Sequence, residues 1–193
     1  MKTARKALLI ALCAVLLVAA SVMGTLAYLT STTEVVTNTF SVGKVVITLD
    51  EAPVDAEGKE TAGTRVTANE YHLIPGSSYD KDPTVHVDAD SEDAWLFVKV
   101  ENGISAIETG TTIAQQMADK GWTLVEGQTN VYAYKEIVKA SGDYVVFENF
   151  QISGEADVAS YTDASIKITA YAIQAENFDT AAQAWEAAPA SWN

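Results

Sequence analysis

Apolar and polar side chains alternate along several short segments of this chain, which predicts half-buried β-strands. In residues 94–101, Leu96, Val98 and Val100 alternate with Trp95 and Phe97. Because both faces of this segment are apolar, we expect a central strand that is covered on both sides. Similar patterns predict further strands at residues 42–50, 65–73, 84–87, 122–125, 131–135, 144–152 and 165–175.

Two segments have helical rather than alternating patterns. In residues 111–120, Thr112 and Gln115 have the spacing of a capping box. Thr180 and Gln183 repeat this spacing ahead of a second short apolar stripe. Helices of about two turns are too short to be stable alone, so we expect both to lie against a core formed by strands.

The chain has no internal repeat and no regular alternation of strands with helices. This pattern predicts an all-β fold, specifically an antiparallel β-sandwich of the jelly-roll type with two short connecting or terminal helices. An immunoglobulin-like strand order is the alternative. Residues 51–64 are acidic and nearly devoid of large apolar side chains, so we expect a surface loop or a disordered insert there.

The first 27 residues have the pattern of a secretory signal peptide. Three basic residues precede an apolar run at residues 7–20, which is short for a membrane span. Small residues favour cleavage between Ala27 and Tyr28, and a second candidate site ends at Ala20. We therefore expect a secreted protein that contacts a membrane only through the uncleaved signal peptide.

Residues 28–40 follow the predicted cleavage site and are rich in β-branched side chains, without Pro or Gly. This composition favours a strand, yet its Thr-rich first half has little that would anchor it to a core. We expect either a strand that pairs only with an edge offered by another molecule or a frayed terminus ahead of the β-sandwich domain at residues 41–193. The residues that would carry the pairing are Tyr28, Leu29, Val35, Val36, Thr37 and Phe40.

The charge of the chain excludes some classes of partner. Its 193 residues have a formal net charge of −14. Removal of residues 1–27 takes three of the 12 basic residues and none of the 26 acidic ones, which leaves 9 minus 26, or −17. Such a surface repels nucleic acids and anionic lipid head groups. The single cysteine, Cys13, lies in the predicted signal peptide, so we expect neither disulfides nor thiol chemistry in the mature chain.

Common catalytic signatures are absent from the sequence, including G-x-S-x-G, H-E-x-x-H, G-x-G-x-x-G and the phosphate-binding loop. We therefore expect neither enzymatic activity nor a catalytic cofactor. His72 and His86 are the only histidines, and a zinc site built on them would need a carboxylate from a neighbouring loop. Hydrogen-bonded histidines on strands are the favoured interpretation.

One acidic cluster is a candidate cation site. Its carboxylates are close enough in sequence to bind Ca²⁺, although the cluster lacks the full EF-hand pattern. The alternative is a solvated turn that protects a sheet edge with charge. The residues of the cluster are Asp88, Asp90, Glu92 and Asp93.

Several motifs together resemble the TasA and camelysin family of exported bacterial proteins, whose signal peptides are cut by the dedicated signal peptidase SipW. The junction GTLAYLT at residues 24–30 and the segment TNTFSVGKV at residues 37–45 carry most of the resemblance. Further similar stretches are residues 69–71, 74–76, 81–85 and 96–102.

The resemblance implies a jelly-roll protein that is secreted to the cell surface or biofilm matrix of Gram-positive bacteria. Members of that family assemble into fibres when the N-terminal segment of one subunit adds a strand to the next. Residues 28–40 would be the donor strand, and the partners would be further copies of the chain and, during export, the signal peptidase. The alternatives are a secreted camelysin-like metallopeptidase, an activity attributed to some members, and a surface-displayed binding module.

Overall fold

The computed structural model describes residues 44–190 and residue 192. The predicted signal peptide, the cleavage site between Ala27 and Tyr28 and all the predicted donor-strand residues of segment 28–40 lie outside the described residues. In the part of the chain that is described, no helix is both long enough and apolar enough to cross a membrane.

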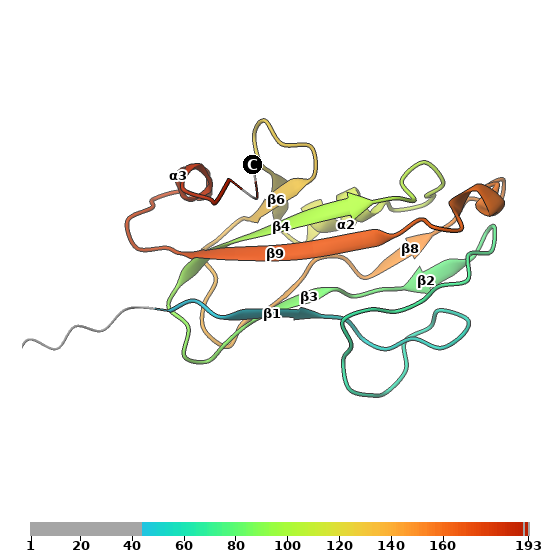
Figure 1. Ribbon diagram of the computed structural model, residues 1–193, viewed down its shortest axis with the longest axis horizontal. Coiled ribbons are helices and arrows are strands. Elements are labelled where there is room, and N and C mark those ends of the chain that lie inside the picture. The colour runs from blue at the N-terminus through green and yellow to red at the C-terminus, as the bar shows by residue number, and fades with distance from the viewer. Residues whose placement is uncertain (1–43, 191, 193) are drawn as a thin grey trace, which may run out of the picture. The chain divides into compact units, whose positions relative to one another are not determined.

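The described chain is mostly β, as predicted, and all its strands pair antiparallel (Figure 1). One sheet has the order β1-β3-β7, a second pairs β2 with β8, and the largest has the order β5-β6-β4-β9. The strands are β1 (Ile47–Asp50), β2 (Ser78–Asp80), β3 (Thr84–Val87), β4 (Ala94–Asn102), β5 (Trp122–Leu124), β6 (Val131–Tyr134), β7 (Asp143–Val145), β8 (Asn149–Gln151) and β9 (Ile166–Gln174).

The main core lies between the largest sheet and the sheet that contains β1 and β3, which form two layers (Figure 1). Leu96 and Val98 of β4 enter this core from one layer, and Val85 and Val87 of β3 enter it from the other. The prediction that Leu96, Val98 and Val100 form one buried face of β4 is therefore confirmed. The jelly-roll connectivity stays a prediction.

The second face of β4 is covered by α3 (Ala181–Glu186), as its aromatic side chains predict. Trp95 and Phe97 form a second core with Trp185 of α3, and the ring centroids of Phe97 and Trp185 are 5.3 Å apart. Each large apolar side chain buried in this way stabilises the fold by about 1.5–3 kcal/mol.

The capping box predicted for the first helix is confirmed in α2 (Ile113–Asp119). The hydroxyl of Thr112 accepts a hydrogen bond from the Gln115 N–H, and the Gln115 side chain accepts one from the Thr112 N–H. A 3₁₀ turn at Val158–Tyr161 precedes β9.

The prediction of a strand at residues 65–73 is wrong, because the structure has no strand there. Only Val66 makes a β-bridge there, to Glu51, and the neighbouring Arg65 side chain forms ion pairs with Asp50 and Asp82. Residues 51–64 form a surface loop, held by a bridge between Val54 and Glu60. The alternative of a disordered insert is therefore wrong.

The single strand predicted at residues 144–152 is divided into β7 and β8, which pair with β3 and β2 respectively. Pro83 lies between β2 and β3, and it has no N–H to donate to a ladder. Its carbonyl still accepts a hydrogen bond from the Val146 N–H. The break in the ladder thus falls where Pro83 meets the chain between β7 and β8. The strand predicted at residues 42–50 is shorter than expected and begins at Ile47.

Candidate functional site

Two edge strands, β1 and β9, lie next to each other along one side of the two layers. Within residues 44–190, β9 pairs only with β4 and β1 pairs only with β3. The outer edge of each strand therefore presents N–H and C=O groups that no described ladder uses. A long open edge of this kind is a template for an additional strand, and β9 has nine residues.

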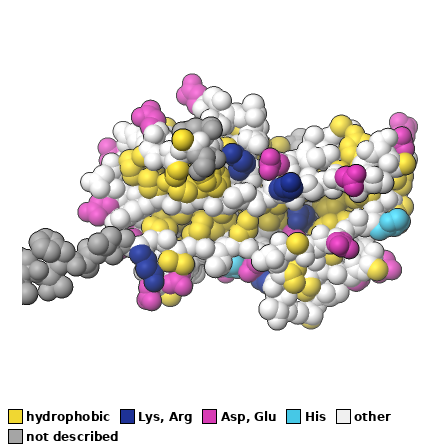
Figure 2. Space-filling model, viewed as in Figure 1, with side chains coloured by type: hydrophobic (Ala, Val, Ile, Leu, Met, Phe, Trp, Pro, Cys, Tyr) yellow, Lys and Arg dark blue, Asp and Glu magenta, His cyan; other side chains and the backbone are white. Residues whose placement is uncertain are grey.

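A groove runs between these two edges. A cavity of about 480 Å³ is lined by residues 49–51 on one side and by residues 166–169 of β9 on the other. A second cavity of about 420 Å³ shares Lys81 and Ile166 with the first and extends to Phe150. Figure 2 shows hydrophobic side chains along the slot between the two layers. The two cavities adjoin and form one groove, whose lining mixes apolar side chains such as Ile166 and Phe150 with polar ones such as Asn69 and Lys81.

The inward side chains of β9 leave the main core incompletely covered along this groove. Ile166 and Ile168, which line the groove, pack against the core but are only half-buried, as are Ala170 and Ala172 farther along β9. Burying apolar surface of this kind stabilises a complex by roughly 25 cal/mol for each Å² removed from water. Both backbone pairing with the open edge and apolar contact with the groove would therefore stabilise a bound strand.

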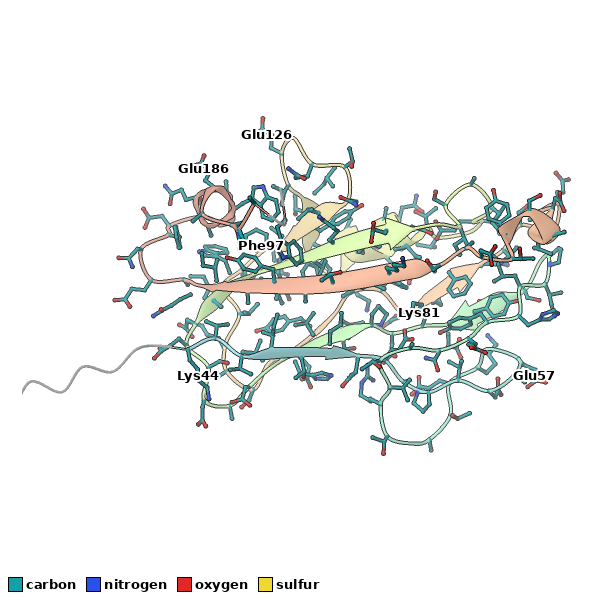
Figure 3. All side chains as sticks on the ribbon, in the orientation of Figure 1. Lys44, Glu57, Lys81, Phe97, Glu126 and Glu186 are labelled. Carbon is teal, nitrogen blue, oxygen red and sulfur yellow. The ribbon has the colours of Figure 1, made fainter. Side chains whose placement is uncertain are left out.

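A buried ion pair lies beside the groove. Lys81 donates a hydrogen bond to Oε2 of Glu51, and their side chains are only 8% and 5% exposed. Lys81 belongs to the chain that joins β2 to β3 and lines the groove together with residues 166–169 of β9 (Figure 3). The Lys81 ammonium also lies 5.8 Å from the centre of the Tyr71 ring. Burial, together with the charge of Glu51, raises the pKa of the Tyr71 hydroxyl.

The other carboxylate oxygen of Glu51, Oε1, is buried and has no hydrogen-bond partner among the described residues. A buried polar atom without a partner costs about 1–3 kcal/mol. The pair was not predicted from the sequence, although one signal was present. Glu51 is in phase with Ile47 and Leu49, whose alternation marks the inward face of β1.

The outer face of the sheet β1-β3-β7 carries a network centred on His86. Its Nε2 lies 2.9 Å from Oδ1 of Asp50 in β1, and its Nδ1 lies 2.6 Å from Oδ1 of Asp143 in β7. Burial alone lowers the pKa of His86, but the hydrogen bonds and charges of Asp143 and Asp50 outweigh it and raise the pKa above the usual value. Arg65 extends the network from Asp50 to Asp82.

The interpretation of His86 as a hydrogen-bonded strand histidine is confirmed. Both of its ring nitrogens contact carboxylates, so neither is free to bind a metal in this arrangement. The same interpretation is wrong for His72, which is exposed and lies in a loop rather than a strand.

The acidic cluster lies in the turn between β3 and β4. The side chain of Asp88 accepts a hydrogen bond from the Asp90 N–H, and Asp93 pairs with Lys139. Glu92 is exposed, and its N–H donates to the Lys44 carbonyl. Among residues 44–190, no three His, Cys, Asp or Glu side chains converge in a geometry that could hold a metal ion. Binding of Ca²⁺ at this turn stays a prediction.

Comparison of the chain with protein-family models, with curated proteins and with solved structures finds no match.

Proposed function

We propose that the protein is a secreted structural subunit of the cell surface or biofilm matrix, which assembles into fibres after its signal peptide is removed. In this proposal, residues 28–40 of one copy pair with the groove between β1 and β9 of the next copy. The observation that carries the proposal is the nine-residue edge strand β9, whose inward side chains are only half-buried.

The dimensions of the two elements are compatible. A strand rises about 3.3 Å per residue, so the thirteen residues of the segment extend about 43 Å and the nine residues of β9 extend about 30 Å. The segment can therefore follow the whole open edge. Main-chain hydrogen bonds would supply affinity, and alternate side chains entering the groove would supply specificity.

The proposed contact joins two different surfaces, an N-terminal segment and a groove. Each copy thus has one segment to offer and one groove to fill. A contact of this head-to-tail kind gives a filament unless its rotation closes a ring. Cleavage of the signal peptide fits the order of events, because it frees the segment once the protein has been exported.

The proposal is tested by expressing the chain from Tyr28 and, separately, from Ser41, and by examining both with negative-stain electron microscopy at matched concentrations. We expect filaments from the longer chain only. Circular dichroism of both chains controls for folding. Equal assembly of the two chains would contradict the proposal, because the shorter chain lacks the donor segment.

A further inference from the structure

Glu51, whose Oε1 has no hydrogen-bond partner among the described residues, lines the groove that would receive the added strand. Glu51 and Lys81 line the groove opposite residues 166–169, and Lys81 bonds only one of the two carboxylate oxygens. Oε1 of Glu51 thus remains a buried acceptor without a donor among the described residues. An added strand that donates an N–H or O–H to this oxygen would remove the free-energy cost of leaving it without a hydrogen bond.

The segment at residues 28–40 contains one side-chain amide, Asn38, which could donate such a hydrogen bond. Side chains two residues apart lie on the same face of a strand, so Val36, Asn38 and Phe40 would share a face in the proposed added strand. This face also carries Glu34, but within residues 36–40 it is the more apolar one, because the opposite face has only Thr37 and Thr39. Asn38, between Val36 and Phe40, would then be carried into the groove as well. A buried side-chain amide needs a hydrogen-bond partner, and Asn38 is the only amide side chain in the segment.

We propose that the side-chain amide of Asn38 in one copy donates a hydrogen bond to Oε1 of Glu51 in the next copy, and that this contact fixes the register of the added strand. The inference rests on the proposed function and deepens it by naming the recognition contact. A shift of the strand by one residue would place Thr37 or Thr39 opposite Glu51 and turn Val36 and Phe40 out of the groove. The polar pair therefore selects one register from several that main-chain pairing alone would accept.

Substitutions in the segment test the contact without changing the acceptor domain. In the chain that starts at Tyr28, Asn38→Asp places a carboxylate opposite the Glu51 carboxylate, whereas Thr39→Asp adds the same charge on the opposite face of the strand. We expect Asn38→Asp to raise the critical concentration for assembly at least tenfold more than Thr39→Asp does. Equal effects of the two substitutions would overturn the inference.

A second test compares the effect of Asn38→Val on assembly with the native groove and with a groove that lacks the ion pair. Replacing a buried ion pair by apolar residues of similar volume is often tolerated, so Glu51→Met combined with Lys81→Met gives an apolar groove. Asn38→Val should raise the critical concentration about tenfold with the native groove and lower it with the apolar one. The same effect of Asn38→Val on both grooves would overturn the inference. If the double variant does not fold, as its thermal melt shows, the comparison of Asn38→Asp with Thr39→Asp decides alone.

The failure of the inference is distinguishable from the failure of the proposed function. If the unmodified chain from Tyr28 forms filaments and the chain from Ser41 does not, but Asn38→Asp and Thr39→Asp behave alike, only the recognition contact is wrong. If the unmodified chain forms no filaments, both are overturned.

Discussion

Lys81 and Glu51 form an ion pair across 30 residues of sequence, with both side chains almost wholly removed from solvent. Removing one partner of such a pair leaves an uncompensated buried charge, which lowers the free energy of unfolding by about 3–5 kcal/mol. Lys81→Met should therefore lower the free energy of unfolding by about 3–5 kcal/mol, as measured by urea denaturation. The double variant Lys81→Met, Glu51→Met should recover most of this loss. A single variant as stable as the native chain would show that the pair is not buried in solution.

The pKa of His86 is raised by its hydrogen bonds to Asp143 and Asp50, so folding favours the protonated imidazole. The stability that this contributes is fully present below the unfolded pKa of about 6.5 and is lost as pH rises through the higher folded pKa. The native chain should therefore become less stable as pH rises above 6.5. His86→Gln should remove this part of the pH dependence, which denaturation midpoints between pH 6 and 8 would measure. An unchanged pH profile in the variant would contradict the assignment.

The start of α2 depends on the hydroxyl of Thr112, which accepts the hydrogen bond from the Gln115 N–H. Thr112→Ala should lower the free energy of unfolding by about 0.5–2 kcal/mol, because that donor loses its partner. Thr111→Ala is the matched control, since Thr111 is exposed and precedes the cap. Equal losses in the two variants, measured by thermal denaturation, would show that the cap contributes nothing.

The local parts of the fold were predictable from the sequence because their determinants lie within a few residues. The alternation in β4 and the pair Thr112 and Gln115 are examples, and both are confirmed. The misassigned strand at residues 65–73 shows the limit of local patterns. Of the expected ladder only the bridge between Val66 and Glu51 forms, and Arg65 binds Asp50 and Asp82, which lie 15 and 17 residues away.

The groove itself could not be predicted, because it depends on which strands become neighbours. β1 and β9 lie at opposite ends of the described sequence. The alternation of apolar and polar residues within each strand does not indicate that their edges meet. The phase of Glu51 indicated an inward carboxylate, but its partner Lys81 follows only from the three-dimensional arrangement. The proposed donor segment, in contrast, follows from its own composition and from its position after the predicted cleavage site.

Charge should oppose the proposed assembly, since each mature copy would carry a net charge of −17, from 9 basic and 26 acidic residues. Salt shortens the Debye length from about 30 Å at 0.01 M to about 8 Å at 0.15 M, which screens the repulsion between copies. The critical concentration for assembly of the chain from Tyr28 should therefore fall as sodium chloride is added over this range, as measured by light scattering. A rise with salt would indicate instead that assembly depends on attraction between opposite charges.

The most direct test of the central claim is hydrogen–deuterium exchange of the chain from Tyr28, compared below and above its critical concentration. Pairing of one copy with the next predicts new protection in two places, at residues 28–40 and at the open edge of Ile166–Gln174. Residues 122–124 of β5, at the opposite edge of the same sheet, provide the internal control and should be unchanged. Filaments that protect β5 but leave residues 28–40 and β9 exchanging as in the unassembled chain would contradict the account.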